Sequence, residues 1–323
     1  MCVRIDVVPE PASIESARPE PVAKPKVIYV LGAGRSGSTI LGVTLGNCEN
    51  VFFAGELDKW LTTSGVPTLK DQERMGFWAE IRGEVKNAEP LFGNRARSLE
   101  RSATLFQVRQ WTARRRLRGE YRRVAEELYL AIAGATHATH IVDSSHYPLR
   151  ALELQGLTGI DLYLIYLVRD PQSVVRSLHR KDVPERSFGT LATNAYLSLT
   201  HLFAVPVFLR HPRARRVFVR HEDFLACPEA ALREILDDVD CSAAVPALGS
   251  LRTGVPLHGN RLVREQVVAL EQERPRTQPR SLATSLLQLP WRLVFALLRP
   301  AVSRCARRPA RGAGALATPP ATP

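Results

Sequence analysis

The stretch Val27-Ile-Tyr-Val-Leu-Gly-Ala-Gly-Arg-Ser-Gly-Ser-Thr39 decides the fold of this 323-residue chain. Its first five residues, Val27–Leu31, are all apolar and predict a strand that is buried on both faces. The next eight, Gly32–Thr39, have the spacing G-x-x-x-x-G-x-[ST] of a phosphate-binding loop between a strand and a helix. In such a loop the backbone N–H groups turn inward, and the following helix adds the positive end of its dipole. The octet therefore predicts a turn that binds an anion.

Four further apolar runs have the same character as the first. They lie at Val51–Ala54, Thr139–Val142, Leu162–Val168 and Arg216–Val219. The intervening stretches are long enough for helices, which we predict at Ser38–Asn47, Thr112–Ile132, Pro171–Lys181 and Pro228–Asp238. Strands that alternate with helices predict an α/β fold with a doubly wound parallel sheet, a P-loop-like three-layer sandwich.

Polar residues follow each of these strands. Beyond the glycine loop they are Gly55-Glu56, Asp143-Ser-Ser-His146, Arg169-Asp170 and Arg220-His-Glu-Asp223. In open parallel sheets the ligand lies outside the carboxyl ends of the strands. Hydroxyls, guanidiniums and carboxylates at five strand ends predict one site for an anionic ligand.

The glycine loop lacks the lysine of nucleoside-triphosphate enzymes, because Ser38 stands at that position. No strand ends in an aspartate placed to hold Mg²⁺. Two alternatives stay open on the residues alone: a P-loop nucleotide-dependent kinase, and a non-catalytic nucleotide- or nucleic-acid-binding protein.

The loop G-R-S-G-S-T and a second segment, Tyr163–Ser177, resemble the sulfotransferases that use 3′-phosphoadenosine-5′-phosphosulfate (PAPS), in their bacterial form. The second segment carries Arg-Asp-Pro after a strand and a serine eight residues after the arginine. The resemblance implies that one set of residues binds the 5′-phosphosulfate of PAPS, namely Arg35, Ser36, Gly37, Ser38 and Thr39. It implies that Arg169 and Ser177 bind the 3′-phosphate, which ATP lacks.

Other segments resemble this family more loosely. Val219–Phe224 matches a segment that lies near the adenine, which implies that His221 contacts the base. Gly55-Glu56 resembles the Gly-Glu whose carboxylate deprotonates the acceptor, so Glu56 is the predicted catalytic base; the alternative is a surface glutamate that caps the helix beginning near Leu57. Gly259-Asn-Arg261 resembles a loop that closes over the donor.

One position departs from the family. Asp143-Ser-Ser-His146 resembles an Asp-Ser-Ser-Lys element whose lysine assists the leaving group. Either a protonated His146 takes this catalytic role, or Arg35 and Arg150 do so.

The resemblance implies a transferase of class EC 2.8.2 that moves a sulfonate group from PAPS to an acceptor hydroxyl and releases PAP. The acceptor is a carbohydrate, a lipid or a metabolite, and its identity is open. Fixed cations and backbone donors can balance the charge of this reaction, so no metal is expected. We expect no nucleic-acid partner.

Composition and charge divide the chain into four parts: a proline-rich disordered leader (1–25), the sulfotransferase domain (26–264), an amphipathic helical extension (265–303) and a disordered basic tail (304–323). The net charge is +12, with eleven arginines against three glutamates from Arg261 onward. The five cysteines are scattered, and no apolar leader precedes the domain, so a cytoplasmic location is expected.

Two arginine-containing segments each allow two interpretations. The segment Leu286–Val302 is either an interfacial helix that touches an anionic membrane or a helix packed on the domain. The Arg114–Arg123 cluster is interpreted as a solvated helix face rather than a groove for a polyanion.

Overall fold

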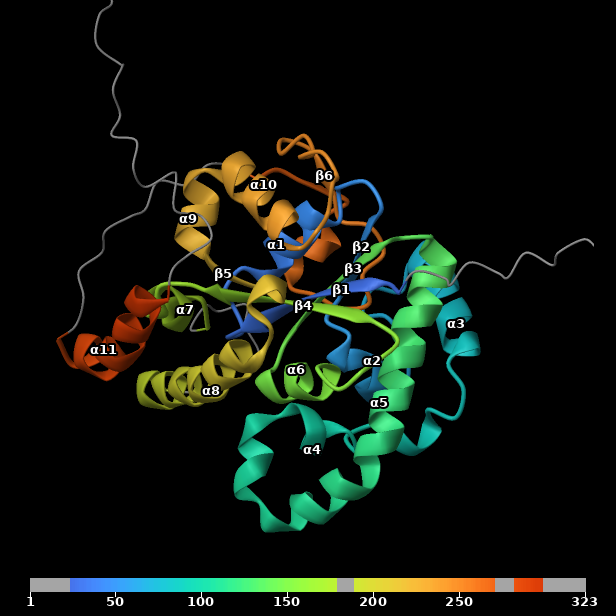
Figure 1. Cartoon of the computed structure of the whole chain (residues 1–323), viewed down its shortest axis with the longest axis horizontal. Helices are drawn as coiled ribbons and strands as arrows, with labels where there is room; N and C mark the ends of the chain where they lie inside the picture. Colours follow the sequence, from blue (N-terminus) through green and yellow to red (C-terminus); the bar gives the residue numbers. More distant parts are fainter. Residues whose placement is uncertain (1–23, 179–188, 271–281, 299–323) are drawn as a thin grey trace, which may run out of the picture.

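The computed structural model describes residues 24–178, 189–270 and 282–298 (Figure 1). Its centre is a five-stranded sheet in the order β2-β3-β1-β4-β5, in which every neighbouring pair is parallel. The strands are β1 (Lys26–Gly32), β2 (Val51–Gly55), β3 (His140–His146), β4 (Asp161–Val168) and β5 (Arg216–Arg220). All five predicted strands are confirmed, each within a few residues.

The apolar runs lack alternation because both faces of the sheet are covered. In β1, Tyr29 and Leu31 join one hydrophobic core, whereas Ile28 and Val30 join another on the opposite face. Helices α1 (Ser38–Leu45), α9 (His221–Ala226) and α10 (Pro228–Asp238) lie over one face of the sheet (Figure 1). Helices α5 (Val108–Thr136), α6 (Pro148–Leu154) and α8 (Thr190–Arg210) lie over the other. The predicted three-layer sandwich is therefore confirmed.

The predicted helices differ from the observed ones mainly at their ends. The first ends at Leu45 rather than Asn47, because Gly46 terminates it. The arginine-rich helix α5 is longer than predicted and runs from Val108 to Thr136. Helix α10 has the predicted bounds, and α7 is described over Pro171–Leu178, with 179–181 outside the described residues.

Several elements were not predicted from the sequence. They are α3 (Gln72–Glu84), α4 (Arg97–Glu100), α6, α8, α9, the antiparallel pair β6 (Leu251–Arg252) and β7 (Val267–Val268), and short 3₁₀ turns, whereas α2 (Asp58–Thr62) is the short helix expected near Leu57. The last helix, α11 (Leu282–Leu297), covers most of the predicted C-terminal helix. The four-part division of the chain stays a prediction, because residues 1–23 and 299–323 lie outside the described residues.

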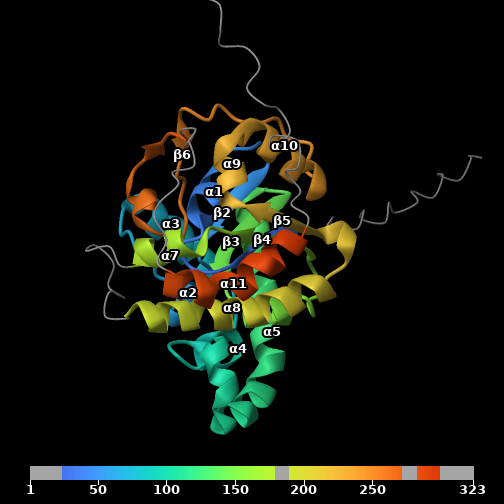
Figure 2. The same cartoon turned by 90° about the vertical axis from the view of Figure 1, so that its left-hand side faces the viewer.

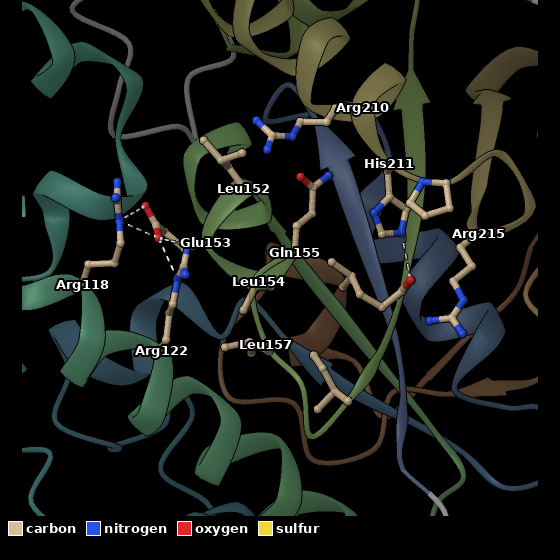
Figure 3. Close-up of a pocket in the computed structure, with 14 residues that line it drawn as sticks. Arg118, Arg122, Leu152, Glu153, Leu154, Gln155, Leu157, Arg210, His211 and Arg215 are labelled. Carbon is tan, nitrogen blue, oxygen red and sulfur yellow. Dashed lines mark hydrogen bonds and ion pairs between the residues drawn. The ribbon is translucent and has the colours of Figure 1, made fainter. Parts of the chain in front are cut away.

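The arginine cluster of α5 is bound to a neighbouring helix. Arg114, Arg118 and Arg122 follow one another at four-residue intervals and all form ion pairs with Glu153 of α6, at 3.4, 3.1 and 3.0 Å. Glu153 is buried. The interpretation as a solvated face is therefore wrong for Arg114, which is buried, whereas Arg118 and Arg122 stay partly exposed while they bind Glu153 (Figure 3).

A cavity of about 620 Å³ lies beside this cluster (Figure 3). Its wall includes Ile160 and Leu162, at the amino end of β4. The polar strand ends that the sequence singled out lie at the opposite, carboxyl end of the sheet. The cavity is therefore separate from the candidate active site.

Candidate active site

The glycine loop has the conformation that an anion-binding turn requires. Arg35 and Gly37 adopt left-handed backbone angles, with φ of 69° and 96°. A Cβ on Gly37 would lie 2.3 Å from Nδ1 of His221, so only glycine fits between the loop and α9. Ser36 donates through Oγ to the carbonyl of Ala33 at 2.7 Å, and the helix α1 starts immediately after the turn, at Ser38.

The second predicted phosphate-binding arginine lies against this loop. Arg169 follows β4, and its Nη1 donates to the carbonyl oxygen of Arg35 at 3.4 Å. The adjacent backbone is fixed, because the N–H of Asp170 donates to Glu222 at 2.8 Å. Ser177 is half-buried in the last turn of α7. Two segments 134 residues apart in sequence thus meet at one end of the sheet.

His221 packs against the glycine loop at Gly37. It is buried at the start of α9, and burial together with the charge of Arg169 lowers its pKa to about 3, so the imidazole is neutral. Its Nδ1 and the Nε of Arg35 are buried and have no hydrogen-bond partner among the described residues. Buried polar atoms in folded proteins are normally paired. Two unpaired polar atoms beside the glycine loop are consistent with a site in which a polar ligand supplies the missing hydrogen bonds.

Glu56 lies at the carboxyl end of β2 and is held by the loop that contains His258. The N–H of Glu56 donates to the carbonyl of His258 at 3.0 Å, and Oε2 lies 3.1 Å from His258 Nδ1. Burial by itself raises the pKa of Glu56, but the contact with His258 and the positive charges of His146 and His258, when protonated, and of Lys59 lower it to about 2. The carboxylate is therefore ionised at neutral pH, as a base must be.

His146 is a neutral side chain in this site. Burial lowers its pKa below 6.5, an effect that the carboxylates of Glu56 and Asp58 only partly oppose. Its Nδ1 lies 3.4 Å from the carbonyl oxygen of Ser144, which can only accept, so this contact needs the proton on Nδ1. The catalytic role of His146 stays a prediction, and a neutral ring does not supply the fixed positive charge of the lysine that the family has there.

Arg150, another candidate for assisting the leaving group, forms buried ion pairs instead. It is 2 % exposed and binds Asp143 at 3.1 Å and Glu100 at 3.4 Å. The hydroxyls of Tyr121 and Tyr129 complete the network around it. This buried cluster holds the end of β3 in place, so Arg35 is the candidate that remains at the loop.

Substitution of Arg150 by methionine should destabilise the fold. The change leaves the carboxylates of Asp143 and Glu100 buried without their cation, which costs about 3–5 kcal/mol. Urea denaturation monitored by circular dichroism measures this loss. Arg116→Met on the exposed face of α5 is the control and should change the free energy of unfolding by less than about 0.5 kcal/mol. Equal stability of the two variants would contradict the structural role of Arg150.

Two contacts of the site, those of Tyr196 and His258, were missed in the sequence, whereas the loop that contains Gly259 was expected. Tyr196 of α8 accepts a hydrogen bond through its hydroxyl from the N–H of Gly34 at 3.2 Å. His258 binds Glu56, and Gly259 packs beside α1, where an added Cβ would lie 3.7 Å from Thr39 Cγ2. The last contact agrees with a loop that lies over the phosphate turn. No local pattern marks Tyr196 or His258, because each is brought to the site by tertiary packing alone.

The geometry defines a class first: an α/β protein with an anion-binding turn and a second cationic position at the carboxyl ends of its strands. A model of the sulfotransferase family matches residues 25–244, and the chain belongs to this family. It is therefore a transferase of class EC 2.8.2, and this assignment replaces the kinase and the non-catalytic alternatives.

One solved structure supports the fold, and two others are similar to the chain more distantly. The sulfotransferase domain of the olefin synthase of Synechococcus PCC 7002 is similar over 87% of this chain and 98% of that one, with 19% identity and a TM-score of 0.52. A sulfotransferase domain from the curacin biosynthetic pathway covers 83% and 98% at 15% identity, with a TM-score of 0.49. STF1 of Mycobacterium tuberculosis covers 68% and 69% at 14% identity, with a TM-score of 0.43. No curated protein matches the chain.

Proposed function

We propose that this sulfotransferase uses PAPS as its donor and transfers the sulfonate group to a hydroxyl of a carbohydrate, lipid or metabolite. The observation that carries the proposal is the contact of Arg169 with the glycine loop. This contact brings two predicted phosphate-binding elements together. PAPS carries phosphate groups on both the 3′ and the 5′ carbon of its ribose, whereas AMP carries one phosphate.

The residues around the loop suit such a donor. The turn from Arg35 to Thr39 would hold the 5′-phosphosulfate with its backbone donors, its hydroxyls and the guanidinium of Arg35. Arg169 offers a planar fork to the 3′-phosphate, and Ser177 lies two helical turns further on. The neutral ring of His221 beside Gly37 can pack on the adenine and offers one unpaired ring nitrogen.

Glu56 is the proposed catalytic base. The acceptor oxygen attacks sulfur while its proton passes to the carboxylate, and the bond between sulfur and the bridging phosphate oxygen breaks with its electron pair staying on PAP. A pKa of about 2 makes Glu56 a weak base in the free protein. Binding of the anionic donor nearby raises that pKa, since a like charge disfavours the ionised form.

His258 is the proposed positioning residue for this base. Because its hydrogen bond lowers the pKa of Glu56, His258→Ala should raise that pKa. The acid limb of the profile of kcat/KM against pH should then move to higher pH. The same pair stabilises the fold at pH values above 4.5, and this contribution is lost as the pH falls towards 2.

The assay for this prediction is the rate of PAP release from pH 4 to 9 with a hydroxyl acceptor found by screening. With the pKa of Glu56 at about 2, the unsubstituted protein should show no acid limb in this range, whereas the His258 variant should show one at its lower end. His137→Ala on the loop after α5 is a control that should leave the limb in place. An unmoved acid limb in the His258 variant would show that this histidine does not set the state of Glu56.

The donor itself is tested by incubating the protein with radiolabelled PAPS and a lipid and metabolite extract. We expect label to enter an acceptor without added ATP or Mg²⁺. Turnover that requires ATP and Mg²⁺ would instead contradict the proposed donor.

A further inference from the structure

Helices α8 and α11 lie side by side at one edge of the molecule (Figure 2). Gln288 donates to Asn194 at 3.0 Å, and the indole of Trp291 donates to Ser198 at 2.8 Å. Phe295 packs edge-on against His201, with 4.9 Å between the ring centroids. The C-terminal helix is therefore packed on the domain, as one of the two interpretations of its sequence expected.

The outward sides of both helices are apolar. On α8 the exposed fractions are 71% for Leu191, 56% for Leu202 and 49% for Leu209. On α11 they reach 71% for Leu286, 57% for Leu293 and 83% for Leu297. The α8 stretch Leu191–Arg210 has a mean hydropathy of 1.3 and is long and apolar enough to cross a membrane. Since 44% of it is buried in the fold, more than half of this apolar stretch is left uncovered. Exposed leucines that recur along one side of each of two adjacent helices mark an interaction surface. We call it the α8–α11 face.

The charged residues within the two helices are both arginines. The chain from Gly189 to Leu209 contains no charged residue, and Arg210 follows directly. Within α11 the charged residue is Arg292, and the helix contains no acidic residue. A second copy of the chain would bring arginines against arginines. An anionic surface complements them instead.

We propose that the α8–α11 face docks onto a membrane that contains anionic lipids. Leucines of an interfacial helix enter the boundary between headgroups and acyl chains, and arginines meet the lipid phosphates. Packing of α11 on the domain is compatible with this docking, because the helix binds α8 with one side and exposes the other.

Helix α8 also reaches the candidate active site, through a different side. Tyr196 of α8 contacts Gly34 of the phosphate loop, so the docking helix also forms part of the candidate active site. Docking on a membrane would make a membrane lipid the acceptor of the sulfonate group. This inference about the acceptor rests on the proposed function, whereas the docking itself does not.

Flotation of the full chain with vesicles tests the docking. We expect at least tenfold tighter binding to phosphatidylcholine vesicles that contain phosphatidylglycerol than to phosphatidylcholine alone, and weaker binding as salt is added. Leu202→Ser and Leu293→Ser should each weaken the binding about tenfold, because each removes a large apolar side chain from the interface. Leu130→Ser on α5, where the leucine is 45% exposed, is the matched control and should bind normally.

A second variant tests the charges without touching the apolar side chains. Arg210→Gln combined with Arg292→Gln should weaken binding to the anionic vesicles about tenfold and leave the thermal unfolding midpoint unchanged. Absence of binding to anionic vesicles would overturn the proposal, as would equal binding by the two leucine variants and the control. Light scattering that shows a dimer dispersed by Leu202→Ser, without vesicle binding, would assign the face to a second copy instead. The assay contains neither donor nor acceptor, so failure of docking is distinguished from failure of sulfonate transfer.

Discussion

Arg169→Ala should bind PAP ten- to a hundredfold more weakly than the unsubstituted protein. The guanidinium is the cation that the fold places between the end of β4 and the backbone of the glycine loop, 3.4 Å from the carbonyl oxygen of Arg35. Charge-assisted hydrogen bonds to a phosphate contribute about 1.5–3 kcal/mol, and each 1.4 kcal/mol is a factor of ten in affinity. Isothermal titration calorimetry with PAP measures the loss directly.

Two further titrations make this result specific. Arg115→Ala, an exposed arginine on α5, should bind PAP normally, which excludes a general effect of net charge. With AMP in place of PAP, the Arg169 variant should lose little, because the group that Arg169 is proposed to bind is missing. An equal loss for both nucleotides would place Arg169 at another part of the ligand.

Glu56→Gln should bind PAP normally and turn over about a hundred- to ten-thousandfold more slowly. The amide keeps the size of the carboxylate and can still accept from the side chain of His258, but it cannot take the acceptor proton. General-base catalysis contributes a factor of this size. Single-turnover transfer from labelled PAPS measures the chemical step apart from product release.

The matched control for this variant is Glu73→Gln in the first turn of α3, an exposed acidic residue remote from the strand ends. It should transfer sulfonate at the unsubstituted rate. Normal turnover by the Glu56 variant would remove Glu56 as the base and favour the alternative in which it caps the following helix.

The strands could be predicted because burial on both faces leaves a continuous apolar run, as in β4, where Leu164 and Tyr166 face one core and Ile165 and Leu167 the other. The glycine loop could be predicted because its requirements are local: a left-handed position at Gly37 and a helix that starts at the next residue. The meeting of Arg169 with Arg35 followed from a general rule, that parallel strands present their carboxyl ends at one edge.

Contacts made by distant segments could not be predicted in this way. Helix α8 lacks charge over most of its length, so no amphipathic period identified it, and its role depends on one hydroxyl, that of Tyr196. The pairing of Arg114, Arg118 and Arg122 was missed because their partner, Glu153, lies on another helix. Arg150 has the same explanation: its sequence position beside His146 suggested catalysis, but tertiary packing surrounds it with Asp143, Glu100 and two tyrosines.

The most direct measurement compares the affinities of PAP and 5′-AMP for the unmodified protein by calorimetry. If the loop after β1 and the arginine after β4 hold the two ends of one nucleotide, the added 3′-phosphate should tighten binding at least about tenfold. No detectable heat with PAP, or the same dissociation constant for PAP and AMP, would contradict that arrangement.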